Sequence, residues 1–198
     1  MPVWLTTRFQ IDLSRPRVMG IVNVTPDSFS DGGAHADARS GLAHCERLVR
    51  EGADILDIGG ESTRPGAPEV PADEEWARIE GVLRGAMSWG VPLSVDTCKT
   101  EVMQRALDLG ADIINDVKAL GAPGALAEVA RHPSCGVCVM HMKGSPATMQ
   151  DAPAYDDVLE EVLATIRHHL GERLRIQVEF VDNVSLVATG KRIASISK

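Results

Sequence analysis

The sequence has no long hydrophobic run. Its first ten residues, MPVWLTTRFQ, contain no apolar stretch of signal-peptide length, and no segment approaches the roughly 20 apolar residues of a transmembrane helix. Positive charge is also scarce, since 20 Lys and Arg stand against 28 Asp and Glu and give a formal net charge of −8. This balance argues against general binding to nucleic acid or to an anionic membrane surface. We therefore expect a cytoplasmic protein with no nucleic-acid or membrane partner.

Cysteines are few, and only one pair has a suggestive spacing, Cys135 and Cys138. A metal or redox site is one interpretation of this CxxC. No second CxxC accompanies it, and the surrounding residues GVCVMHM are typical of a buried strand. Residues three apart in a strand point to opposite faces, so we favour two separate core thiols.

What the sequence does contain is an alternation of apolar strands and amphipathic helices. With 198 residues the chain is long enough for one domain. The tetrapeptide Gly-Ala-Asp-Ile occurs at 52–55 and again at 110–113, each time as a helix stop followed by a strand start. The expected strands cover 17–24, 54–59, 91–96, 112–116 and 137–142, and the expected helices cover 38–49, 73–86, 102–109, 123–131 and 156–170.

This alternation predicts the α/β class with a parallel sheet, the arrangement found in a β/α barrel such as the TIM (β/α)8 type. The units take roughly 30 residues each, so eight of them need about 250 residues. We therefore expect an incomplete barrel with about five recognisable βα units.

Each expected strand carries a polar residue at or near its C-terminal end: Asn23, Asp57, Asp96, Asn115 and His141. Burial of such groups is costly without partners, and the C-terminal rim of a β/α barrel is where sites form. The alternative is that each residue caps a loop or the next helix.

Two loops at this rim have compositions suited to phosphate chemistry. Residues 23–33 are rich in oxygen ligands, and Asn23 with nearby Asp oxygens suits Mg²⁺, which keeps most of its waters. Residues 59–66 contain two glycines and Arg64, a side chain that binds carboxylate or phosphate in bidentate fashion. The alternative for the first loop is a surface loop that carries polar residues without binding a ligand.

Asp96 and Asn115 suit a ligand edge with paired N–H donors, such as an amino-pyrimidinone ring. Pterins and guanines share that edge, so these residue types do not choose between them.

Longer motifs resemble a known family. VMGIVNVTPDSFSDGG (18–33) and DIGGESTRPGA (57–67) are similar to the two signature motifs of bacterial dihydropteroate synthase, and SVDT (94–97), IINDV (113–117) and VMHMKGSPATMQ (139–150) also match. The resemblance implies a TIM barrel that joins 6-hydroxymethyl-7,8-dihydropterin pyrophosphate to p-aminobenzoate, making 7,8-dihydropteroate for folate biosynthesis.

The resemblance also implies roles for individual residues. Asp57, Asp96 and Asn115 would form the catalytic group around the pterin ring, and Asn23 would hold Mg²⁺. The substrate-binding residues would be Asn23, Thr63, Arg64, Asp96, Asn115 and Met140.

The resemblance ends near residue 170, which divides the chain into a barrel portion, 1–170, and a divergent tail, 171–198. The family's later lysine, arginine and histidine motifs have no counterpart in the tail. We expect a truncation or a shifted reading frame, weak or absent catalysis, and doubtful formation of the family's homodimer. Two alternatives stay open: a catalytically impaired pterin-binding remnant, and a barrel of the methyltetrahydrofolate methyltransferase type, which has no need of a pyrophosphate-binding first loop.

Overall fold

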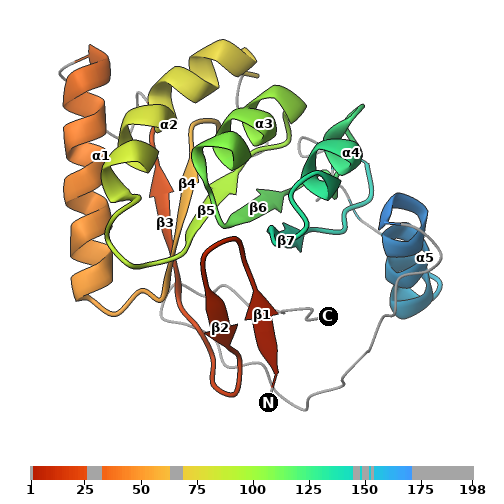
Figure 1. Ribbon diagram of the computed structural model, residues 1–198. Coiled ribbons are helices and arrows are strands. Elements are labelled where there is room, and N and C mark those ends of the chain that lie inside the picture. Colours follow the sequence, from red (N-terminus) through yellow and green to blue (C-terminus); the bar gives the residue numbers. More distant parts are fainter. Residues whose placement is uncertain are drawn as a thin grey trace.

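A five-stranded parallel sheet forms the centre of the protein (Figure 1). The computed structural model describes residues 2–25, 33–62, 69–144, 148, 152 and 154–170, with the backbone only at 33–37 and 169–170. The sheet strands are β3 (Met19–Asn23), β4 (Ile55–Gly59), β5 (Leu93–Asp96), β6 (Ile113–Asp116) and β7 (Gly136–Val139). They pair in chain order, so each crossover brings the chain to the next position of the sheet.

A helix follows every strand of this sheet. The helices are α1 (Gly33–Arg50), α2 (Ala72–Ala86), α3 (Thr100–Leu109), α4 (Ala125–Ala130) and α5 (Val158–Leu170). The five βα units confirm the predicted α/β class and the partial barrel. The strands are shorter than expected, and β7 ends at Val139, three residues before the predicted end at 142.

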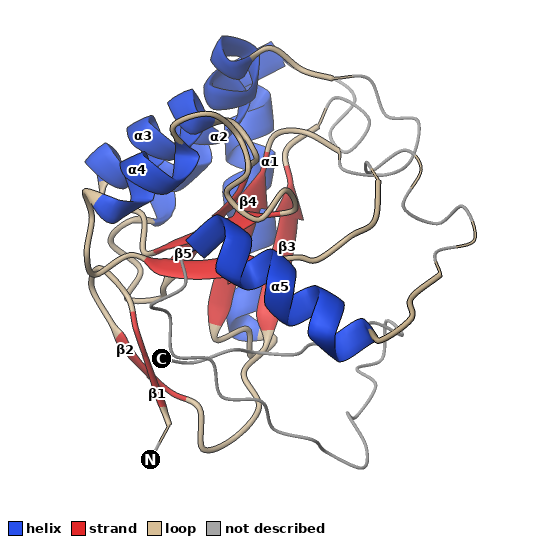
Figure 2. Ribbon diagram, turned by 90° about the vertical axis from the view of Figure 1, so that its right-hand side faces the viewer, coloured by secondary structure: helices blue, strands red, loops and turns tan. Residues whose placement is uncertain are grey.

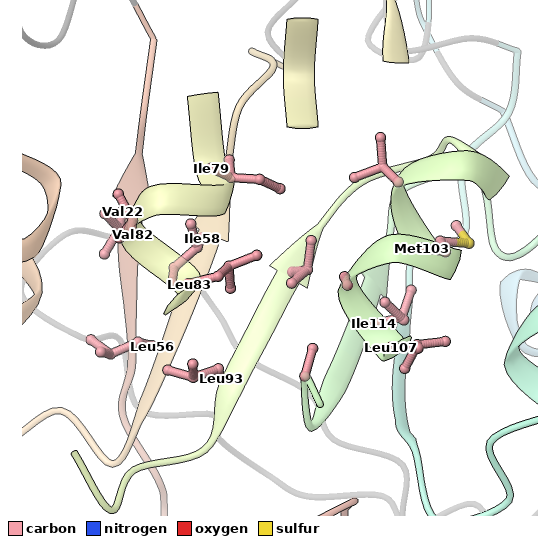
Figure 3. Packing of buried hydrophobic residues seen from close by; sticks show 14 of the residues in the cluster. Val22, Leu56, Ile58, Ile79, Val82, Leu83, Leu93, Met103, Leu107 and Ile114 are labelled. Atoms are coloured by element: carbon pink, nitrogen blue, oxygen red, sulfur yellow. The ribbon is translucent and has the colours of Figure 1, made fainter. Parts of the chain in front are cut away.

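The main core lies between one face of the sheet and helices α1 to α4, which stand side by side in Figure 1. Every second strand residue points into it, among them Val22, Ile58 and Leu93, which pack in one cluster with Ile79 and Leu83 of α2 (Figure 3). All five are fully buried, which stabilises the fold by about 1.5–3 kcal/mol for each such side chain. This packing fixes which strand residues face the opposite side.

The repeated tetrapeptide marks two sharp returns from helix to strand. Gly52 follows α1 with φ of 102°, and Gly110 caps α3 with φ of 104°. Residues with a Cβ rarely adopt these left-handed angles, so glycine is needed at both positions. The prediction that each copy ends a helix and begins a strand is confirmed.

An antiparallel hairpin, which the sequence analysis missed, precedes the sheet. Its strands β1 (Val3–Leu5) and β2 (Gln10–Asp12) are three residues each, too short to show an alternating pattern. Ile11 of the hairpin packs on Ile55 and Ile113, near the N-terminal ends of β4 and β6. Figures 1 and 2 show the hairpin beneath the sheet, at the end opposite the loops that follow the strands. It thus covers the N-terminal end of the face that the helices leave open.

A buried ion pair holds this hairpin in place. The Asp112 carboxylate is 0% exposed and accepts hydrogen bonds from the Arg8 guanidinium (Nη2 to Oδ2, 2.5 Å), the Arg8 backbone N–H (2.9 Å) and the Leu93 backbone N–H (2.9 Å). One carboxylate therefore ties the hairpin, β5 and β6 together.

The two cysteines of the CxxC lie in different environments. Cys135 packs against the core beneath the helices, whereas Cys138 packs on the hairpin side of the sheet. All four cysteines are free thiols, and the predicted placement of Cys135 and Cys138 on opposite sides is confirmed. In the part of the chain that the structure describes, no helix is both long enough and apolar enough to span a bilayer.

We predict that Asp112→Ala destabilises the protein by about 3 kcal/mol, because it leaves the Arg8 charge and the Leu93 amide without their buried acceptor. Glu80→Ala is the control: its partner Arg84 is 60% exposed, and such i,i+4 pairs contribute only about 0.5 kcal/mol. Urea unfolding of both variants measures the difference. Equal losses would show that the hairpin is not anchored through Asp112.

Candidate active site

The parallel register places one residue from each strand in a single row across the open face of the sheet. Asn23 pairs with Gly59, Gly59 with Asp96, Asp96 with Asn115, and Asn115 with Cys138. Paired residues of neighbouring parallel strands point to the same face. Three of the five predicted strand-end residues, Asn23, Asp96 and Asn115, therefore share one row at the C-terminal rim.

Asp57 lies on the same face, one step deeper. It is two residues before Gly59 in β4, and it is 4% exposed. Its Oδ2 accepts a hydrogen bond of 3.0 Å from Nδ2 of Asn115. The structure therefore brings Asp57 into direct contact with the row.

Asp96 is partly buried, and its surroundings are strongly acidic. Burial is the largest cause that raises its pKa to about 7, and the nearby carboxylates of Asp57, Glu75, Asp116 and Glu61 act in the same direction. A carboxyl group with this pKa is present both as acid and as anion near neutral pH, so it both donates and accepts hydrogen bonds.

The small size of Gly59 keeps the row open beside Asp96. A Cβ at Gly59 would lie 3.3 Å from the Asp96 Cβ and 3.5 Å from its Oδ2. A side chain here would fill the space between Asn23 and Asp96. One of the two glycines noted in residues 59–66 therefore leaves room on the row itself.

The remaining predicted residues lie elsewhere or outside the described part. His141 follows the end of β7, where its ring lies 5.7 Å from the tilted ring of Tyr155, and the row takes Cys138 from this strand instead. Its assignment to a strand end is wrong because β7 stops at Val139. Met140 is 37% exposed beyond the same strand. Thr63 and Arg64 lie outside the described residues.

A buried charge network that the sequence analysis missed lies behind the second loop. Lys99 Nζ donates to Glu75 Oε2 at 2.7 Å and to Glu61 Oε2. Glu75 lies in the first turn of α2, where acidic side chains suit the positive helix end, but it is 0% exposed and pairs with Lys99. Only its spacing in the apolar stripe, three residues after Ala72 and four before Ile79, signals burial.

A cavity of about 470 Å³ lies beyond the ends of β6 and β7. Its lining includes Val117, Lys118, Met140, Met142 and Thr165, and none of the row residues. The cavity and the predicted site therefore share Met140 alone.

The turn beside this cavity is strained, since Ala119 and Leu120 have φ of 52° and 59°. Buried Asp116 holds it by accepting hydrogen bonds from the backbone N–H of Lys118 (2.7 Å) and Leu120 (2.8 Å). The loop after β6 is thus set firmly at the rim.

Asn23 is the one predicted metal ligand, and its side chain is exposed at the rim. Within the described residues no group of three or more His, Cys, Asp and Glu side chains could hold a metal ion. A single amide oxygen fits Mg²⁺, which binds through few protein ligands, several waters and substrate phosphates. It does not fit a closed structural zinc site.

We predict that the Asp96 carboxyl group makes stability depend on pH. Its pKa is raised in the folded protein, so the folded state keeps a proton that the unfolded chain releases above about pH 4. Stability is therefore lost as the pH rises from about 4 to 7.

The matched variant Asp96→Asn lacks this titration. Its Tm is expected to equal that of the wild type near pH 4.5 and to exceed it at pH 8. Thermal unfolding at both pH values measures this difference. Parallel pH profiles of the two proteins would contradict it.

Comparisons with known proteins identify the family. A family described as "Pterin binding enzyme" matches residues 19–179. The chain is similar to a dihydropteroate synthase of Neisseria meningitidis serogroup B, with 55% identity over 172 residues that cover 86% of this chain and 60% of that protein.

Two solved structures extend the comparison. A Xanthomonas albilineans dihydropteroate synthase with 4-aminobenzoic acid matches with TM-score 0.70 and 53% identity over 81% of this chain and 56% of that one. A Burkholderia cenocepacia dihydropteroate synthase complexed with 7,8-dihydropteroate matches with TM-score 0.73 and 44% identity, over 85% of this chain and 56% of that one.

The chain spans about three fifths of the length of these relatives. The family match includes the whole sheet and all of helices α1 to α5, and it continues to residue 179. On this match, the chain belongs to the pterin-binding enzyme family.

Proposed function

We propose that the chain acts as a dihydropteroate synthase, joining 6-hydroxymethyl-7,8-dihydropterin pyrophosphate to p-aminobenzoate in folate biosynthesis. The observation that carries the proposal is the row itself. Asp96 and Asn115 lie side by side in register, with Asp57 in contact behind them. Asp96 and Asn115 offer hydrogen-bond acceptors at the spacing of adjacent strands, about 4.8 Å. An amino-pyrimidinone edge offers matching N–H donors.

The charge distribution assigns the two ends of the pterin substrate. The carboxylates around Asp96 make the base of the row negative, which favours a positive charge developing on the ring and repels a diphosphate. We therefore assign the ring to Asp96 and Asn115 and the diphosphate to the outer rim, with Asn23, Thr63 and Arg64. Met140 borders the pterin pocket.

The reaction is a substitution at the pterin methylene carbon. The C–O bond to the diphosphate breaks, and the leaving oxygen keeps the electron pair. The amine nitrogen of p-aminobenzoate forms the new C–N bond and releases one proton to solvent. A neutral aromatic amine needs positioning more than a strong base, so a nucleophilic side chain is not required. Asp96 stabilises the positive charge on the ring during this step.

Asn23 is the proposed Mg²⁺ ligand. When bound, Mg²⁺ would neutralise the diphosphate as it leaves. Separate places for the ring and the diphosphate fit the structure, because the carboxylates at the base of the row would repel the negatively charged diphosphate. We place the protein in the cytoplasm, where its four free thiols would stay reduced.

We predict that Asp96→Asn lowers the rate of dihydropteroate formation on the order of 100-fold, because the ring loses its neighbouring charge. Asp108→Asn is the control, a carboxylate that is 57% exposed on α3, and it is expected to leave the rate unchanged. A coupled assay for dihydropteroate, preceded by isothermal titration with pterin pyrophosphate, measures both steps. Binding without turnover in the wild type would instead favour an impaired remnant. If the chain binds methyltetrahydrofolate and does not bind pterin pyrophosphate, the methyltransferase class would be favoured.

We also predict that Asn23→Ala raises the Mg²⁺ concentration needed for half-maximal binding of pterin pyrophosphate by at least about tenfold, the smallest loss typical when groups that support a metal are removed. Binding of the same pterin without its diphosphate is expected to stay unchanged. Titrations of both ligands across a range of Mg²⁺ test this. Equal loss for both ligands would assign Asn23 to the ring rather than to the metal.

A further inference from the structure

We infer that Asp57 is a positioning residue that sets the donor and acceptor pattern of the ring site by fixing the orientation of the Asn115 amide. The inference rests on the proposed function and deepens it, because it states which ring edge the site selects. The contact that carries it is the 3.0 Å hydrogen bond from Nδ2 of Asn115 to Oδ2 of Asp57.

The direction of this bond follows from the chemistry of the two groups. An ionised carboxylate only accepts hydrogen bonds, whereas an amide has a donating NH₂ and an accepting oxygen of nearly the same shape. In the structure the Asn115 NH₂ faces Asp57 and donates to its Oδ2, the orientation that an anionic Asp57 would select. Oδ1 of Asn115 then points away from Asp57, toward the rim.

Burial makes this orientation strict. Asp57 is 4% exposed and lies below the row, while Asn115 is partly exposed on it. A flipped amide would set an oxygen against a carboxylate in a poorly hydrated place, which is costly. The amide therefore presents an acceptor to any ligand that rests on the row.

The consequence is a selectivity for N–H donors. Asn115 Oδ1 and the adjacent Asp96 carboxyl match a ring with a 2-amino group and a ring N–H. A 2-oxo pteridine of the same size, a lumazine, would set an oxygen against one of these acceptors. Sites built on buried hydrogen bonds reject such analogues strongly. Asp57 would thus act on ring choice without contacting the ring.

The test is a reversal of the pair. Asp57→Asn leaves the Asn115 amide free to flip, and Asn115→Asp places two carboxylates about 3 Å apart, at the distance of the hydrogen bond that they replace. The double variant restores one donor, one acceptor and a single negative charge, with the roles exchanged, so that the carboxylate introduced in β6 again presents an oxygen to the ligand. Affinities for 6-hydroxymethylpterin and 6-hydroxymethyllumazine are measured by fluorescence titration at pH 8 on the full chain.

Each single variant is expected to bind the pterin at least about tenfold more weakly, and Asp57→Asn is expected to lose the preference for pterin over lumazine. The double variant is expected to regain most of the pterin affinity and most of the preference for pterin over lumazine. Asp54→Asn is the control, a carboxylate just before the same strand that pairs with Arg17 at the opposite end of the sheet. It is expected to keep the wild-type preference. Losses that add in the double variant, or an unchanged preference in Asp57→Asn, would overturn the inference.

A second measurement covers variants that fail to fold. The side-chain NH₂ of Asn115 in the wild-type protein is expected to exchange slowly with solvent, because it is bonded to Asp57. An NMR exchange experiment with ¹⁵N-labelled protein detects this without any ligand, and fast exchange would overturn the inference. If the wild type shows slow exchange but does not bind the pterin, the proposed function fails while the Asp57–Asn115 contact stands.

Discussion

In-register pairing of the five parallel strands is the constraint on which the site depends. Because side chains alternate along a strand, Val22, Ile58, Val95 and Ile114 point to the helices only if their neighbours point away. Slippage of one strand by a single residue would bury a polar rim residue under the helices and expose an apolar one. The apolar core thus fixes the register, and the register aligns Asn23, Gly59, Asp96, Asn115 and Cys138.

The hairpin affects how much water reaches the face of the sheet on which this row lies. By packing Ile11 on Ile55 and Ile113, it shields the N-terminal end of the open face from water. Burial is the largest cause of the raised pKa of Asp96, and the carboxylates of Asp57, Glu75 and Asp116 act in the same direction. The same environment favours positive charge on a bound ring and makes the donor and acceptor pattern of Asn115 decisive. Fold, charge and ring recognition therefore share one origin.

Sequence patterns predicted the repeating units and three members of the row, because periodicity and strand-end position are local properties. Gly52 and Gly110 marked their turns for the same reason. The hairpin escaped prediction because three-residue strands carry no period. The Lys99 network with Glu61 and Glu75 did as well, because it joins residues up to 38 positions apart. The contact between Asp57 and Asn115 spans 58 positions, so only the folded register reveals it. His141 was misplaced because an apolar run does not show where its strand ends.

The central claim is that the row receives the pterin ring. A crystal structure of the chain with 6-hydroxymethyl-7,8-dihydropterin pyrophosphate and Mg²⁺ tests it most directly. The account predicts the amino-pyrimidinone edge within hydrogen-bond distance of Asp96 and of Oδ1 of Asn115, with the diphosphate toward Asn23. A ring bound instead in the cavity beside Met142 and Thr165, out of reach of Asp96 and Asn115, would contradict it.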